Sequence, residues 1–191
     1  MKKILLSYFT SFGGMDANSS EEVAKLIDCE NVDKIKLEVK YNKDFKTLRE
    51  AVFNNNYDYL LMLGQARGRE KISLESRATN LNNPKAKDND NFLPNEEIYE
   101  GASHYLYTKI DLGKLLEKIN LQNVNISKNT GSFLCNYVYY SVLYEVNIPS
   151  LFIHLPAFRG QVSDPRIPTM PLDVMVDEIK AIIKILSEEE E

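Results

Sequence analysis

A cysteine, a histidine and a glutamate in this chain occupy positions from which they could do chemistry together. Cys135 lies in "NTGSFLCNYVYYSV", just after a Thr-Gly step and in the expected first turn of an aromatic-rich helix. Unpaired amides and the positive end of the helix dipole favour a thiolate there, so the position predicts a lowered thiol pKa. A free cysteine in an apolar helix is also a common packing residue, and that interpretation stays open.

A cysteine nucleophile needs a base, and the chain offers two histidines. His154 ends the expected buried strand 149–156, where it would emerge at a sheet edge; the alternative is a core histidine bonded to a backbone carbonyl. His104 follows a long loop and is interpreted as a surface or packing residue. Glu75, in the apolar-flanked "ISLESRATN", is our candidate for orienting an imidazole. Its alternative is a solvated charge or a partner for Arg77.

The composition limits the class of protein. The 191 residues suit one domain, and 43% hydrophobic with 27% charged residues is typical of a globular core-forming chain. The net charge of −5, with scattered basic residues, gives no sign of a nucleic-acid-binding face. No apolar run reaches the roughly 20 residues of a membrane helix. We interpret the N-terminal segment as a buried strand rather than a signal peptide, and we therefore expect a cytoplasmic protein.

The cysteines and histidines point away from cross-links and metals. Cys29 and Cys135 are the only cysteines in the sequence, and a cytoplasmic location argues against a disulfide between them. Neither cysteine nor histidine has the spacing of metal ligands, so we expect no metal site.

Apolar runs of strand length alternate along the chain with segments of helical period. We expect helices to begin at Asn18 or Ser19, each with a glutamate three residues later, and at Asp44. The expected strands are 2–9, 32–39, 57–64, 124–127 and 149–156, and the expected helices are 18–27, 44–55, 112–120, 132–146 and 171–186.

This alternation predicts an α/β fold in which a twisted, mostly parallel sheet lies between two helix layers, as one domain over residues 1–191. Ligands bind at the carboxyl ends of such strands, so the loops "SFGG", "GQARGRE" and "HLPAFRGQ" should border the site. Loops 80–101 and 157–170 are long enough to predict a function. The acidic end, 187–191, is expected to be a disordered tail. "GQARGRE" lacks the spacing of a phosphate-binding loop.

Five segments resemble, in the same order, the motifs of the cysteine-type pyroglutamyl peptidases (pyrrolidone-carboxylate peptidases). "YFTSFGG" followed by "NSSEEVAK" is similar to the family's "GFEPFGG" loop and the "NPS" or "NPT" after it. "GQARGREKISLESRATN" is similar to "GxAxGR…I…ER…N", and "FLCNYVYY" contains "LCNY". "FIHLPAFRGQ" is similar to "FIHxPxxPxQ", and "PTM" to the "PxM" before the last helix. The resemblance covers nearly the whole chain.

The resemblance implies a cytoplasmic cysteine exopeptidase that removes N-terminal pyroglutamate from peptides through a thioester, without a cofactor, as a dimer or tetramer. It implies that Cys135 is the nucleophile, His154 its proton partner and Glu75 the residue that orients His154. The substrate-binding residues that it implies are Phe9, Phe12, Asn18, Gln65, Lys85, Phe133 and Leu134.

Some positions depart from the family's pattern. The family's "DARIPDN" is "NPKAKDN" here, so Lys85 replaces an arginine and Ala86 follows it. Lysine keeps the charge but loses the planar, bidentate geometry. Ser11, Ser19 and Arg159 stand where the family has prolines. These departures leave two alternatives open: a non-catalytic relative that binds pyroglutamyl peptides, and a thiol amidase for another small lactam or amide.

Overall fold

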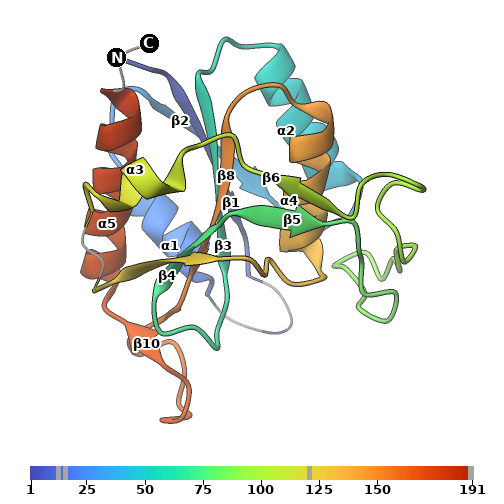
Figure 1. The fold of residues 1–191 in the computed structure, drawn as a ribbon. Coiled ribbons are helices and arrows are strands. Elements are labelled where there is room, and N and C mark those ends of the chain that lie inside the picture. Colours follow the sequence, from blue (N-terminus) through green and yellow to red (C-terminus); the bar gives the residue numbers. More distant parts are fainter. Residues whose placement is uncertain (12–13, 15–16, 120–121, 189–191) are drawn as a thin grey trace.

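A six-stranded sheet is the centre of the molecule (Figure 1). The structure is a computed structural model that describes residues 1–11, 14, 17–119 and 122–188. Within these residues the sheet has the order β2-β1-β3-β8-β4-β7. Its strands are β1 (Ile4–Phe9), β2 (Val32–Leu37), β3 (Tyr59–Gln65), β4 (Ile72–Glu75), β7 (Val124–Ser127) and β8 (Ser150–Leu155). The expected strands are all present; β4 was not expected.

Strand direction confirms the predicted fold class. β2, β1, β3 and β8 are parallel neighbours. β1, β3 and β8 are mostly apolar and buried, as expected for parallel strands covered on both faces, whereas β2, at the sheet edge, contains both buried and exposed residues. β4 runs antiparallel to β8, and β7 runs parallel to β4. The sheet is therefore mostly parallel, with one reversal beside β8.

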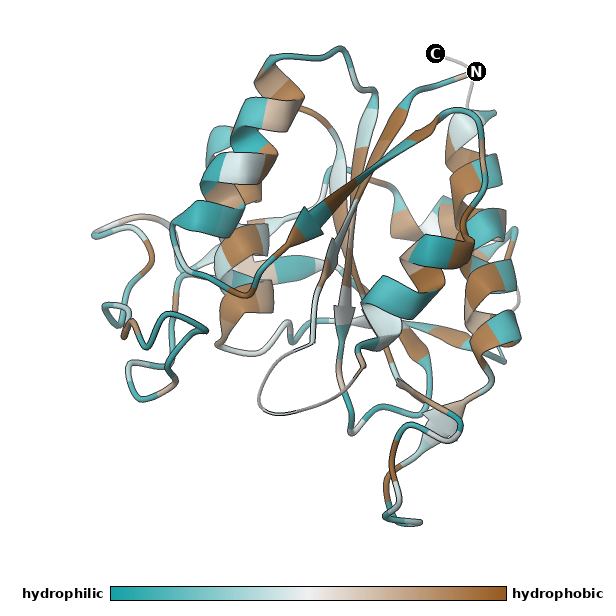
Figure 2. Cartoon of the chain, turned by 180° about the vertical axis from the view of Figure 1, so that it is seen from behind, coloured by the Kyte–Doolittle hydropathy of each residue, from teal (hydrophilic) through white to brown (hydrophobic). Residues whose placement is uncertain are grey.

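Helices cover both faces of the sheet, which gives the expected three layers (Figure 1). Alternate residues of each strand point to opposite faces, so Leu61 and Leu63 pack towards one layer and Leu60 and Met62 towards the other. In Figure 2 the strands at the centre of the sheet are brown to white, whereas the helices are brown and teal. One layer contains α1 (Ser19–Leu26), α3 (Leu112–Leu116) and α5 (Leu172–Ser187), and the other contains α2 (Lys43–Phe53) and α4 (Leu134–Glu145).

One of the two predicted helix starts is correct. Asn18 caps α1, and its side chain accepts a backbone hydrogen bond from the first turn. The prediction that Asp44 caps α2 is wrong, because Asn42 is the N-cap residue. The Asp44 carboxylate accepts instead from the backbone N–H groups of Glu38, at 2.9 Å, and Lys40, at 2.8 Å. It fixes the turn between β2 and α2 rather than the end of the helix.

Four short strands lie outside the central sheet. β5 (Arg77–Thr79) pairs antiparallel with β6 (Tyr105–Tyr107), and β9 (Ala157–Phe158) pairs parallel with β10 (Thr169–Met170). Segments of two or three residues are too short for a pattern to predict them. Loop 80–101 contains only turns and bends, as expected.

The described ends of the chain lie near one another (Figure 1). Helix α5 includes Ser187, and Glu188 is its C-cap, so these two residues of the expected acidic tail are ordered. Residues 189–191 lie outside the described part of the chain. None of the helices described here is both long and apolar enough to cross a lipid bilayer.

Candidate active site

Glu75 and His154 lie on adjacent strands and bond to each other. In the antiparallel pairing of β4 and β8, Glu75 is opposite Phe152, so His154 lies two residues further along the same face. His154 Nδ1 is 2.7 Å from Glu75 Oε1, and both side chains are buried. Because a carboxylate only accepts hydrogen bonds, Nδ1 carries the proton. In the neutral imidazole, Nε2 is then the acceptor for another proton.

Arg69 is a second partner of the same carboxylate oxygen. Its Nη2 lies 2.9 Å from Glu75 Oε1 and also donates to the carbonyl oxygen of Asn129, in the segment that leads into α4. A buried carboxylate without a compensating charge is costly, and the Arg69 guanidinium supplies the opposite charge. The sequence analysis placed "GQARGRE" at the border of the site but assigned no role to Arg69.

Cys135 is the second residue of α4, whose N-cap residue is Phe133. The apolar Phe133 side chain makes no capping hydrogen bond to the first turn. Serine, threonine, asparagine or aspartate at that position would occupy one of the free N–H groups. The helix therefore presents uncapped backbone donors and the positive end of its dipole beside the sulfur.

Gly64 lets the sulfur approach the sheet. A Cβ at this position would lie 3.0 Å from Cys135 Sγ and 2.7 Å from Cζ of the Phe152 ring. In the pairing of β3 and β8, Gly64 is opposite His154. Because paired strands lie about 4.8 Å apart, a sulfur placed over Gly64 lies next to the histidine. The three residues nominated from the sequence are thus brought together.

Burial determines the resting protonation of this group. The pKa of the Cys135 thiol is raised to about 12, mainly by burial and also by the negative charge of Glu75, while the cysteine's own backbone N–H and Arg69 act in the opposite direction. Burial also lowers the pKa of His154, against the opposite effect of Glu75. At neutral pH a thiol therefore faces a neutral imidazole. The expected lowering of the thiol pKa is wrong, because desolvation outweighs the helix dipole.

Two further side chains tie α4 to residues 75–81, the segment that begins with the acid. The buried Asn136 amide donates to the carbonyl oxygens of Thr79 and Leu81 and accepts from the Thr79 N–H. The Tyr139 hydroxyl donates to the carbonyl oxygen of Glu75 over 2.8 Å. These bonds fix the position of α4, which carries Cys135, relative to Glu75. The sequence analysis missed both residues; the one available signal was an asparagine inside an otherwise apolar helix.

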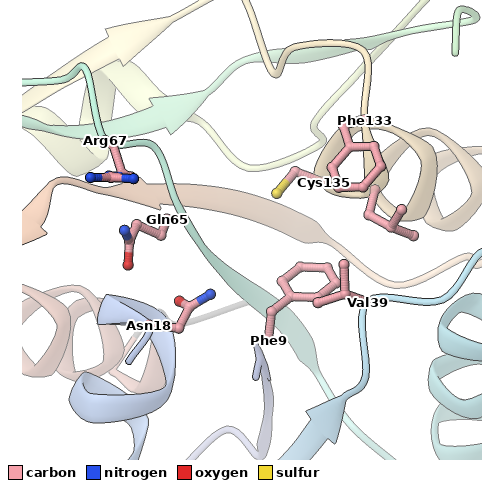
Figure 3. Close-up of a pocket in the computed structure, with 8 residues that line it drawn as sticks. Phe9, Asn18, Val39, Gln65, Arg67, Phe133 and Cys135 are labelled. Atoms are coloured by element: carbon pink, nitrogen blue, oxygen red, sulfur yellow. The ribbon is translucent and has the colours of Figure 1, made fainter. Parts of the chain in front are cut away.

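A cavity of about 270 Å³ opens beside Cys135 (Figure 3). One side is apolar and the other polar, with Cys135 between them. The apolar lining is Phe9, Val39, Phe133 and Leu134, and the polar lining is Asn18, Gln65 and Arg67. Five of the seven substrate-binding residues implied by the family resemblance therefore lie in this lining: Phe9, Asn18, Gln65, Phe133 and Leu134.

The other two implied residues lie elsewhere. Phe12 is outside the described residues. Lys85 is exposed in a turn of loop 80–101 and does not line the cavity. Its loop still reaches the site, because the Asn83 N–H donates to the carbonyl oxygen of Ser132, next to Phe133.

The alternatives for the other titratable residues are also decided by contacts. His104 is exposed and packs against Tyr105, as a surface or packing residue should. Glu75 is not a solvated charge, since it is fully buried against His154 and Arg69. Arg77 lies over the Tyr105 ring, 3.8 Å from its centroid, rather than on Glu75.

Val39, which the sequence analysis missed, lines the cavity in an unusual backbone conformation. Its φ is 61°, a region that β-branched residues rarely adopt. The Asp44 carboxylate bonds to the backbone N–H groups on both sides of it, at Glu38 and Lys40, and so holds this conformation. Strain of this kind concentrates at ligand sites. The wall residue is therefore fixed by a buried acid.

Segments that follow three strands meet at Gln65, whereas the expected loop "SFGG" is only partly within the described residues. Gln65 Oε1 accepts from the Ser19 backbone N–H at 2.7 Å and from Gln161 Nε2 at 2.8 Å. Gln161 also donates to the carbonyl oxygen of Ala17. Segments after β1, β3 and β8 are joined at one edge of the sheet, as predicted for the carboxyl ends of parallel strands. In the described part of the chain, no group of three or more His, Cys, Asp or Glu side chains is arranged to hold a metal ion.

Comparison with known proteins gives matches along almost the full chain. The model of the pyroglutamyl peptidase family matches residues 2–189. The chain is 32% identical to a pyrrolidone-carboxylate peptidase of Brachyspira hyodysenteriae, over 95% of this chain and 97% of that one. It is 30% identical to one of Thermosipho africanus, over 98% and 100% of the two chains.

Solved structures give the same result. The pyroglutamyl peptidase I of Bacillus amyloliquefaciens superposes with a TM-score of 0.88, at 28% identity, over 98% of this chain and 96% of that one. The pyrrolidone carboxyl peptidase of Fervidobacterium islandicum gives 0.86, also at 28% identity, over 98% and 99%.

Proposed function

Because the chain belongs to the pyroglutamyl peptidase family, we propose that it is a cysteine exopeptidase that hydrolyses the amide bond after an N-terminal pyroglutamyl residue. The observation that carries the proposal is the grouping of Cys135, His154 and Glu75 beside a half-apolar cavity. Pyroglutamate is a flat, neutral lactam with one N–H donor and one carbonyl acceptor. Such a ligand suits aromatic walls with a few fixed polar groups and no charge partner.

The substrate ring packs against Phe9 and Phe133, with Leu134 beside them and Asn18 and Gln65 bounding the polar side. An N-terminus without the lactam leaves buried polar groups unpaired, which costs about 1–3 kcal/mol per group. Peptides that begin with an ordinary residue are therefore rejected. Phe12 and Lys85 belong to the proposed substrate-binding set on the family resemblance alone.

In acylation, the Cys135 sulfur attacks the carbonyl carbon between pyroglutamate and the next residue. His154 Nε2 takes the thiol proton as the attack proceeds, because the raised thiol pKa disfavours a free thiolate beforehand. Glu75 stabilises the imidazolium that forms, and Arg69 pairs with the same carboxylate oxygen. The uncapped backbone N–H groups at the start of α4 bind the oxyanion.

Three proton transfers through His154 then complete the reaction. The imidazolium of His154 protonates the leaving amine, the C–N bond breaks, and a pyroglutamyl thioester remains on Cys135. Water gives a proton to the neutral imidazole and attacks the thioester carbon. The C–S bond breaks, free pyroglutamate leaves, and the proton returns from His154 to the sulfur.

Release of a fluorescent amine from a pyroglutamyl amide tests the proposal, with the wild type compared with Cys135→Ala under reducing conditions. We expect turnover by the wild type and a loss of about 10³-fold or more in the variant. Turnover that survives the substitution would overturn the assignment of the nucleophile. Binding of pyroglutamyl peptides without turnover would favour the non-catalytic relative, and turnover of a different amide alone would favour the thiol amidase.

The proposal extends to the context in which the enzyme works. Residues 1–191 act as one peptidase domain, in the cytoplasm, as a homodimer or homotetramer; location and assembly rest on the family resemblance. Exposed apolar side chains on the described surface, among them Phe53, Tyr107 and Tyr144, are available for contacts between copies. Light scattering of the purified protein measures the assembly, and a monomer at every concentration would contradict it.

A further inference from the structure

The cavity beside Cys135 has a single charged side chain among its described lining residues, and this is Arg67. The same residue lines a second cavity of about 400 Å³, together with Phe158 and Gln161. There too it is the one charged residue in the described lining. Arg67 is exposed, and no ion pair joins it to a carboxylate in the part of the chain that the structure describes. A lone guanidinium therefore faces the space around the nucleophile.

The two cavities adjoin at Arg67. Gln65 lines the first and Gln161 the second, and their side chains bond to each other over 2.8 Å. In Figure 3 Arg67 and Gln65 lie on one side of the Cys135 sulfur and Phe133 lies on the other. If the apolar side holds the lactam, the peptide after the scissile bond extends towards Arg67 and the second cavity.

The lactam cannot be the partner of this charge, because it is neutral. We infer that Arg67 binds a carboxylate on the leaving side of the substrate, so that the preferred substrates are pyroglutamyl peptides with an anionic group next to the scissile bond. The inference rests on the proposed function and narrows its substrate class. The planar guanidinium donates to both oxygens of a carboxylate, which a lysine cannot reproduce.

Two groups could supply the carboxylate: the C-terminus of a dipeptide, or an acidic side chain on the residue after pyroglutamate. The C-terminal carboxylate is attached to the first Cα after the scissile nitrogen, so its position is set by the bond under attack. An acidic side chain has additional rotatable bonds and loses more entropy when it is held. The dipeptide C-terminus is therefore the preferred ligand.

Two matched substrate pairs isolate the charge. Pyroglutamyl-alanine and its C-terminal amide differ only at the terminal carboxylate, and pyroglutamyl-glutamate amide and pyroglutamyl-glutamine amide differ only at the side chain. The readout is the ratio of kcat/KM within a pair. For the wild type at low ionic strength we expect pyroglutamyl-alanine to have a kcat/KM about two to five times that of its amide. This is the size of effect that an exposed ion pair gives. Added salt should reduce this ratio.

Variants assign the ratio to one residue. Arg67→Gln should bring the ratio to about one, Arg67→Lys should keep part of it, and Arg67→Glu should invert it. The matched control is Arg159→Gln, which removes the same charge from an exposed position that lines neither cavity. Its ratio should equal that of the wild type. Because both substrates of a pair are measured with the same variant, a general loss of its activity does not change the ratio of kcat/KM.

The outcomes separate the inference from the function on which it rests. A ratio that depends on Arg67 in either pair supports the inference, and the pair that responds identifies the source of the carboxylate. Turnover of all four substrates with ratios near one, or with equal ratios in wild type and Arg67→Gln, overturns the inference and leaves the proposed function standing. No turnover of any substrate by folded wild type overturns both.

Discussion

The proton on the Cys135 sulfur is controlled by burial, and this sets the expected pH dependence. The neutral form of His154 accepts that proton, and burial lowers the pKa of His154 from the ordinary 6.5. A base with a lowered pKa stays neutral to lower pH, so the acid limb of kcat/KM should have its midpoint below 6.5. A pH profile with a pyroglutamyl amide measures this. A midpoint at or above the ordinary histidine value would contradict the burial argument.

The thiol itself can be followed without substrate. Its pKa is raised to about 12, so iodoacetamide should alkylate Cys135 slowly at neutral pH and faster as the pH rises. Peptide mapping separates this reaction from alkylation of the half-buried Cys29. Fast alkylation of Cys135 that does not change between neutral and alkaline pH would instead indicate a preformed thiolate.

The charge of Arg69 lowers the pKa values of both Cys135 and His154, so its removal should move the pH profile of kcat/KM. The guanidinium lowers the pKa of His154, so Arg69→Gln should raise that pKa and shift the acid limb to higher pH. Arg69→Lys should restore the position of the limb, although it lacks the second hydrogen bond to Asn129. A residue that only supported the fold would reduce activity equally at all pH values, and that result would refute the assigned role.

Close packing between elements leaves no room for a side chain at Gly64 of β3. An alanine there would bring a methyl group to 2.7 Å from the Phe152 ring and 3.0 Å from Cys135 Sγ. Overpacking of this kind costs about 1–3 kcal/mol, and the shift of α4 should lower kcat by at least about tenfold because misplaced groups react poorly.

The matched control is Gly68→Ala, in the connection between β3 and β4, where a Cβ would meet nothing within 4 Å. Urea unfolding and kcat for the two variants separate close approach from a general effect of replacing glycine. Equal behaviour of Gly64→Ala and Gly68→Ala would show that the sulfur does not lie over β3 as described.

Elements were predictable where the local pattern and the final environment agree. β3 and β8 are continuous apolar runs and are buried along their length, so their sequences indicated them directly. β4 was missed because "ISLE" contains Ser73 and Glu75, whose burial depends on partners elsewhere in the chain. Asp44 was wrongly predicted to be the N-cap of α2, because its carboxylate bonds backwards to the preceding turn. Local pattern alone cannot tell these two uses of an aspartate apart.

Over the whole molecule, the same limit separates the residues that were found from those that were missed. Cys135, His154 and Glu75 could be nominated from residue type, position and family resemblance. Asn136 and Arg69 could not, because each acts through contacts with a remote segment, such as the bond between Asn136 and Thr79 across 57 residues. Such contacts exist only after the sheet order is known, and the antiparallel pairing of β4 with β8 was not expected.

The single-domain proposal predicts one cooperative unfolding transition, because both helix layers pack on one sheet. The chain has no tryptophan and 11 tyrosines, so tyrosine fluorescence and far-ultraviolet circular dichroism are the suitable probes. Their denaturant transitions should coincide. A plateau, or two different midpoints, would indicate parts that unfold independently.

The central claim is that the Cys135 sulfur attacks the pyroglutamyl carbonyl. Rapid acid quenching of the wild type during turnover, followed by mass spectrometry of its peptides, tests this most directly. We predict a pyroglutamyl adduct on the peptide that contains Cys135, removable by hydroxylamine as a thioester should be, and absent from Cys135→Ala. Undiminished turnover by Cys135→Ala, or an adduct on any other residue of an active enzyme, would contradict the account.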